Sequence, residues 1–109
     1  MPTFEDVRRL ALAQPEAEEI LTWETDITFR VRKKIFAIGG EGATQVSIKS
    51  TPLVQEMLLD RDPATFARAA YVGRFGWVTV DLARIEIVEL EQLLRDAWRL
   101  TAPKKVVAR

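Results

Sequence analysis

The sequence contains neither cysteine nor histidine. Without cysteine the chain has no disulfide, no thiol nucleophile and no thiolate metal ligand, which is typical of proteins in a reducing compartment. Without histidine it lacks the commonest general base near neutral pH and the commonest transition-metal ligand. We therefore expect a protein that is not an enzyme, with no catalytic residues, no cofactor and no metal site.

Long apolar runs are also missing. No stretch approaches the ~20 apolar residues that a membrane span needs, and residues 1–6 lack the basic segment and apolar run of a secretory signal. The 109 residues are 48% hydrophobic and 29% charged, which lies in the range of one folded domain. We expect one cytoplasmic domain spanning residues 1–109, with no membrane contact.

The net charge is zero, but the charges are unevenly distributed along the chain. Residues 1–26 contain seven acids and two bases, whereas residues 30–49 contain five bases and one acid. A neutral total argues against strong nonspecific binding to nucleic acid, but it leaves room for a local positive surface.

Hydrophobic periodicity predicts three helices and several strands. Apolar residues at helical spacing predict helices from Thr3 to before Pro15, from Thr51 to near Asp60, and over about 86–102. Alternation predicts strands near 26–32, 35–38, 46–49 and 77–82, with a further short strand near 68–71. The acidic segment 16–24 is predicted to be a loop, and the basic tail after Pro103 is predicted to fray. This order predicts an α+β fold, α-β-β-β-α-β-β-α, with a mainly antiparallel sheet covered by helices in two layers.

Several short motifs together resemble the MmcQ/YjbR family. They are Leu12-Ala13-Gln14-Pro15, Trp23, Phe29-Arg30-Val31 followed by Lys34-Ile35-Phe36-Ala37, Val46-Ser47-Ile48-Lys49, and Gly76-Trp77-Val78 before the last helix. The resemblance implies a fold like that of CyaY, the bacterial frataxin, or of secretion chaperones. Some members have been proposed to bind DNA through a double-wing arrangement, but the family has no established biochemical activity. Members often carry glycine at the hairpin tip, where this chain has Lys33, which implies either modest strain or a wider turn.

A basic hairpin is the candidate functional site. We predict that six residues form a positive surface that meets DNA phosphates: Arg30, Arg32, Lys33, Lys34, Lys49 and Arg74. Arg30 and Arg32 are placed on the outer face of one strand, with Lys33 and Lys34 in its turn. A solvated sheet face guarded by lysines is the alternative explanation of the same pattern. The alternative function is a protein-interaction or chaperone-like adaptor domain, acting on a protein partner or as a homodimer.

Other clusters have ordinary structural explanations. The acids at 16–26 could suit a hard cation, but they lack the spacing of a calcium loop, so a solvated loop is expected. The glycines at 39–42 lack a phosphate-loop pattern and predict a turn. Tyr71, Arg74 and Trp77 could stack on a base, although Trp77 and Trp98 are expected to pack in the core. The place of Trp23 stays open.

Overall fold

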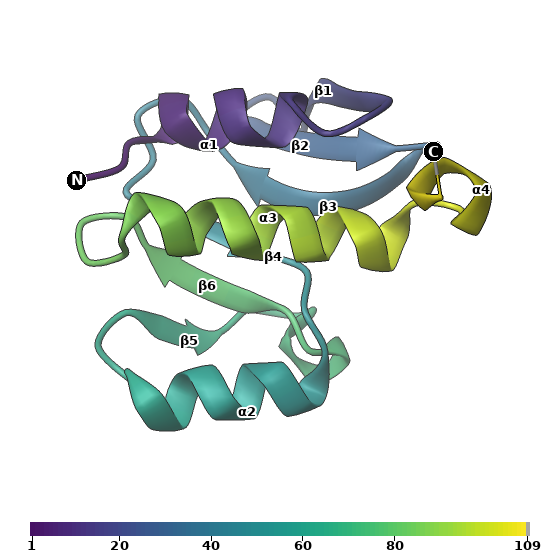
Figure 1. Cartoon of the computed structure of the whole chain (residues 1–109). Coiled ribbons are helices and arrows are strands. Elements are labelled where there is room, and N and C mark those ends of the chain that lie inside the picture. Colours follow the sequence, from purple (N-terminus) through teal and green to yellow (C-terminus); the bar gives the residue numbers. More distant parts are fainter. Residues whose placement is uncertain (109) are drawn as a thin grey trace.

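The computed structural model describes residues 1–108, in which alternating and helical apolar patterns form one sheet and its covering helices (Figure 1). In chain order the elements are α1 (Phe4–Leu12), β1 (Ala17–Thr22), β2 (Asp26–Val31), β3 (Lys34–Gly39), β4 (Gln45–Ile48), α2 (Pro52–Arg61), β5 (Phe66–Arg68), the short 3₁₀ helix η1 (Gly73–Phe75), β6 (Val78–Asp81), α3 (Ile87–Thr101) and α4 (Lys104–Val107). The predicted α+β class is confirmed.

All strands belong to one sheet with the order β1-β2-β3-β4-β6-β5, in which every neighbouring pair is antiparallel. The register aligns one row of side chains across the whole sheet: Ile20, Thr28, Ile38, Ser47, Thr79 and Ala67. Side chains alternate between the two faces of a strand, so this row marks one face and its neighbours mark the other.

The core lies between the second face of the sheet and the helices. Phe29, Ile48 and Val78 share one register position on that face and are fully buried together with Leu90 and Leu94 of α3. α1 and α3 lie in front of the sheet in Figure 1, and α2 lies along β5. The apolar stripe of α3 is therefore its packing surface, as its spacing predicted.

Two local predictions are wrong, and one strand is displaced. Residues 17–22 form strand β1 rather than a loop, because pairing with β2 satisfies the backbone hydrogen bonds on one side although most of the side chains stay exposed. The short strand expected near 68–71 is present and pairs with β6, but it lies at Phe66–Arg68. Residues 104–107 form α4 rather than a frayed tail, because the buried side chain of Val106 anchors them, and Arg109 lies outside the described residues.

Candidate nucleic-acid interface

The β2–β3 hairpin ends in a two-residue turn. Val31 pairs with Lys34, so that Arg32 and Lys33 alone make the turn, with φ angles of 50° and 70°. Two successive positive φ angles give the turn a twist that matches antiparallel strands, and glycine or asparagine usually supplies them. The wider turn considered from the sequence is thus excluded, and Lys33 occupies a strained conformation. Lys34, predicted to lie in the turn, is the first residue of β3, and the side chains of Arg32, Lys33 and Lys34 are all exposed to solvent.

Arg32 already has a partner within the chain. Its Nε and Nη2 donate to the two carboxylate oxygens of Glu16 at 2.5 and 3.1 Å. This bidentate contact raises the pKa of the Arg32 guanidinium, with the hydrogen bond to Glu16 as the largest cause. Arg32 therefore contributes less free positive charge to the tip than Lys33 and Lys34 do.

Arg30 lies apart from the turn. It belongs to β2 and shares its face with Thr28, whose hydroxyl accepts from Arg30 Nε at 3.0 Å. Arg30 Nη2 also donates to the hydroxyl of Thr22 on β1, at 3.3 Å. The prediction that Arg30 and Arg32 share an outer strand face is wrong, because β2 ends at Val31 and Arg32 belongs to the turn.

Lys49 and Arg74 also lie outside the hairpin turn, on other elements. Lys49 follows β4 and lines a groove between α2 and α3 together with Val54, Leu93 and Leu100, so it lies on the helical side of the sheet. Arg74 is in η1, where its guanidinium carbon lies 4.8 Å from the ring centre of Phe75. The six predicted residues therefore do not form one continuous face. Lys33, Lys34 and Lys49 share one end of the molecule, and Arg30 lies on the open face.

The aromatic residues considered for stacking on a base, Tyr71 and Trp77, differ in exposure. Tyr71 is 97% exposed, whereas Trp77 is buried in the molecule. Trp98 is also buried, and its Nε1 donates to the carbonyl of Pro15 at 2.9 Å. The core positions predicted for Trp77 and Trp98 are confirmed, and Trp23 is exposed.

Sequence reasoning missed two lysines at the basic end. α3 ends and α4 lies at the end of the molecule where β2 passes into β3, on the right of Figure 1. Lys104 and Lys105 of α4 are exposed there. The signal for this helix was the pair Val106-Val107 directly after a proline and two lysines, because a buried apolar residue holds a terminal turn in place. We define the basic end as Lys33, Lys34, Lys49, Lys104 and Lys105.

Acidic residues gather at the opposite ends of the strands. The β1–β2 turn carries Glu24, the β3–β4 turn carries Glu41, and Asp81 ends β6 opposite the start of β4. Arg8 of α1 joins part of this region, since its guanidinium contacts Glu5, Glu19 and Glu41, the Nε to Glu19 at 2.8 Å. These contacts, that with Glu41 first, raise the pKa of Arg8 above its ordinary value. Apart from Glu16 and Glu18, which lie beside Arg32 and Arg30, charge is thus separated along the strand direction, although its sum is zero.

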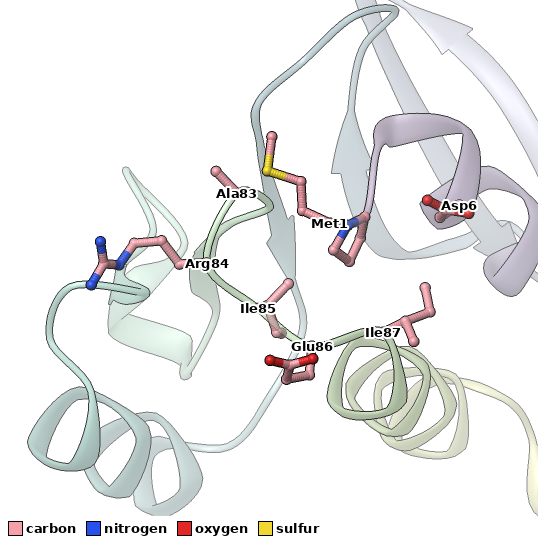
Figure 2. A pocket seen from close by; sticks show the side chains of 8 residues that line it. Met1, Asp6, Ala83, Arg84, Ile85, Glu86 and Ile87 are labelled. Atoms are coloured by element: carbon pink, nitrogen blue, oxygen red, sulfur yellow. The ribbon is translucent and has the colours of Figure 1, made fainter.

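The hollow beside the start of α1 holds no converging set of reactive groups. It is lined by Met1, Pro2, Asp6 and the segment Ala83–Ile87. Figure 2 shows Arg84 and Asp6 on opposite sides of this hollow. The Asp6 carboxylate accepts from the backbone N–H of Thr3 at 2.8 Å, which lowers its pKa. Within residues 1–108, the acidic side chains also form no group suited to a metal ion.

The architecture defines a small α+β protein of a single compact domain. A family model described as YjbR matches residues 12–100, so the chain belongs to the YjbR family. This confirms the resemblance seen in its motifs. In the part of the chain that the structure describes, the helices are too short or too polar to cross a membrane.

Relatives and one solved structure agree with this placement. The uncharacterized proteins Mb2600 of Mycobacterium bovis and Rv2570 of Mycobacterium tuberculosis are each 27% identical over 121 residues, covering 98% of this chain and 94% of theirs. The crystal structure of Deinococcus radiodurans protein DR2400, with a DUF419 domain, superposes with a TM-score of 0.81 at 24% identity. The match covers 92% of this chain and 78% of that one, and it shows the fold.

Proposed function

We propose that this protein is a non-enzymatic binding module that contacts the phosphates of nucleic acid, DNA foremost, through its basic end. One observation carries the proposal. Among residues 1–108, no carboxylate lies within ion-pair distance of Lys33, Lys34, Lys104 or Lys105, whereas four arginines (Arg8, Arg9, Arg32 and Arg61) are ion-paired. Unpaired lysines that gather at one end of a neutral protein provide a local attraction for a polyanion.

The hairpin places its tip where DNA could reach it. β1 and β4 flank the hairpin, and β1 follows β2 as far as Val31, so the hairpin does not project from the sheet as a free ribbon. We therefore expect its lysines to contact the phosphate backbone from outside the grooves. Lys104 and Lys105, on a separate element, would add further phosphate contacts. Phosphate contacts of this kind position a protein without reading sequence. We therefore expect weak, sequence-tolerant binding that depends on salt. The absence of cysteine supports a place of action in the cytoplasm.

Fluorescence anisotropy with a labelled 20-base-pair duplex tests the proposal over a series of salt concentrations. Lys33→Glu and Lys104→Glu should each weaken binding and lower the slope of log K against log salt by about 0.9 per lost phosphate contact. Arg84→Glu is the matched control, because it makes the same charge change in an exposed loop away from the basic end. The proposal fails if the wild-type protein does not bind at low salt, or if Arg84→Glu weakens binding as much.

A protein-interaction role is the second candidate, favoured by the outer side of α2. Leu53 is 68% and Met57 is 60% exposed, and Val54 continues the apolar surface into the groove toward α3. Exposed apolar groups that adjoin in this way are typical of contact surfaces. Sedimentation of wild type and Leu53→Ser/Met57→Ser tests it, since a self-associating protein should become more monomeric with the double substitution. A monomeric wild type that captures no partner through this surface would count against it.

A further inference from the structure

The outer edge of β1 is open to another strand. β1 lies at one end of the sheet, pairs with β2 alone and extends over six residues. Most of its side chains are exposed. An edge strand of this length presents a row of backbone N–H and C=O groups that an added strand can pair with.

The pairing with β2 identifies which backbone groups face outward. The N–H of Ala17 donates to the carbonyl of Gln14 at 3.1 Å, so residue 17 turns its N–H away from β2. The carbonyl of Ile20 faces β2, since it accepts from the hydroxyl of Thr28 at 3.1 Å. Antiparallel pairs alternate in their hydrogen bonding, so Glu19 and Leu21 direct both their N–H and C=O groups to the outer edge. An added strand would find four groups there.

The side chains beside this edge define the chemistry of a partner. Within residues 1–108, Glu18 and Glu24 make no ion pair. A cavity over β1 and β2, beside the β1–β2 turn, has Leu21 and Ile27 as apolar lining and the carboxylates of Glu19, Glu24 and Glu41 around them. Arg8 contacts two of these three carboxylates, which leaves an excess of negative charge. Lysine or arginine fits such a site, because its aliphatic stem packs on apolar surface while its charge stays near the carboxylates.

We propose that the β1 edge binds an extended, lysine- or arginine-rich segment of another protein as an added strand of the sheet. Leu21 and Trp23, which are 66% and 70% exposed, supply apolar contact beside the backbone pairing. A second copy of this chain fits poorly, because two antiparallel β1 strands would bring Glu18 and Glu19 of both copies together. Nucleic acid fits poorly for the same electrostatic reason. The inference is independent of the basic end.

A synthetic peptide, KVKTKVKTK, provides the test, and its binding is followed by nuclear magnetic resonance. Binding should slow hydrogen exchange at the amides of Glu19 and Leu21, since these N–H groups become bonded. Peptide KVKPKVKPK has the same charge but fewer backbone donors and a poor strand conformation, so it should bind at least about tenfold more weakly. Peptide EVETEVETE should not bind.

Variants separate backbone pairing from charge. Leu21→Pro removes one outward N–H, a change that edge strands tolerate, and should abolish the exchange protection while the thermal unfolding curve reports intact folding. Glu18→Lys/Glu24→Lys should weaken peptide binding about tenfold or more through charge repulsion. Glu56→Lys/Asp60→Lys, which makes the same total charge change on the exposed side of α2, is the matched control and should leave binding unchanged.

Three outcomes would overturn the inference. Equal binding of the proline-containing peptide, without protection at residues 19 and 21, would indicate attraction by charge alone. Unchanged binding by Glu18→Lys/Glu24→Lys would remove the role of the carboxylates. A wild-type dimer that dissociates with Leu21→Pro would assign the edge to a second copy of the chain. Because Lys33→Glu should leave peptide binding intact, the test does not depend on nucleic-acid binding.

Discussion

Gln55 offers a direct test of how α2 is held against the sheet. Its side chain is 6% exposed, and its Nε2 donates to the carbonyls of Gly73 at 2.7 Å and Trp77 at 2.8 Å. Each carbonyl also accepts one backbone hydrogen bond, from the N–H of Gly76 and of Ala69 respectively. The amide thus joins a helix to the segment before β6 without being the sole partner of either carbonyl.

Replacing Gln55 by Met keeps the shape of the side chain and removes both donors. Each lost hydrogen bond should cost about 0.5–1.5 kcal/mol, and the full penalty of an orphaned carbonyl does not apply because each keeps one donor. We therefore expect the free energy of unfolding to fall by about 1–3 kcal/mol. For a domain of this size that corresponds to a decrease in Tm of roughly 5–15 °C.

Replacing Gln55 by Glu gives a different dependence on pH. A carboxylate there would face two carbonyl oxygens, so its folded-state pKa should lie above the unfolded value of about 4.3. For an acid with a raised pKa, stability is lost as pH rises above the unfolded pKa, because the unfolded state releases its proton first. The Glu variant should therefore be further below wild type at pH 7 than at pH 4.

Urea unfolding of both variants and wild type, followed by circular dichroism at pH 4 and pH 7, measures these differences. The m-value should be the same for all three proteins, because a change would mean that the compactness of the unfolded or the native state differs. The reasoning is refuted if Gln55→Met costs less than ~0.5 kcal/mol. It is also refuted if the deficit of Gln55→Glu is the same at both pH values.

Three further substitutions test other local features. Gly76→Ala should destabilise the protein by about 3 kcal/mol in urea unfolding, because φ is 101° and a Cβ would lie 2.5 Å from the carbonyl carbon of Thr51; an unchanged midpoint would contradict this. Lys33→Gly should stabilise the protein by roughly 0.5 kcal/mol by relieving the positive φ, yet weaken DNA binding, with Tm and anisotropy as the readouts. Thr65→Val removes the hydroxyl that bonds Asp62 at 2.7 Å and holds the pKa of that carboxyl below its usual range. In the variant, the pKa of the Asp62 carboxyl should rise, as measured by a carbon-13 titration. A lowered pKa stabilises the folded protein only above the unfolded pKa, so the difference in stability between wild type and variant should shrink as pH falls through the folded pKa of Asp62.

The fold was predictable wherever burial imposed a period on the sequence. β2 alternates Ile27, Phe29 and Val31 toward the core, and α3 repeats its buried residues at helical spacing. β1 has no such pattern, since its side chains are largely exposed on both faces. Its strand conformation depends on pairing with β2, which a local pattern does not record. The acids that suggested a solvated loop are the side chains of an exposed edge strand.

The buried face of α2 does not follow from its apolar residues. Leu53, Met57 and Leu58 are large apolar side chains of similar size, but only Leu58 of these three is buried. Gln55 takes an inward position instead, because two backbone carbonyls satisfy its amide there. A sequence pattern predicts that glutamine is exposed, because it does not show that the carbonyls of Gly73 and Trp77 lie within hydrogen-bond distance in the folded chain.

The candidate site was predictable in composition and only partly in geometry. Lys33 followed from its place in the hairpin turn and Lys34 from its place directly after it, but the position of Arg32 depended on where β2 ends. Lys104 and Lys105 were missed because the tail was expected to fray, whereas Val106 anchors it. Local spacing places residues within one element, and tertiary packing decides which elements share a surface.

The arrangement of charge connects the two proposals. The basic end lies where β2 passes into β3, and Glu24 and Glu41 lie at the turns beyond the other ends of these strands. A net charge of zero therefore covers a basic and an acidic end of the sheet rather than a uniformly neutral surface. The start of β1 adjoins the basic end, because Ala17 pairs with Val31 and Glu16 forms an ion pair with Arg32. Under the two proposals, the basic end would repel a basic peptide and the carboxylates of β1 would repel a polyanion, so each surface would select against the partner of the other.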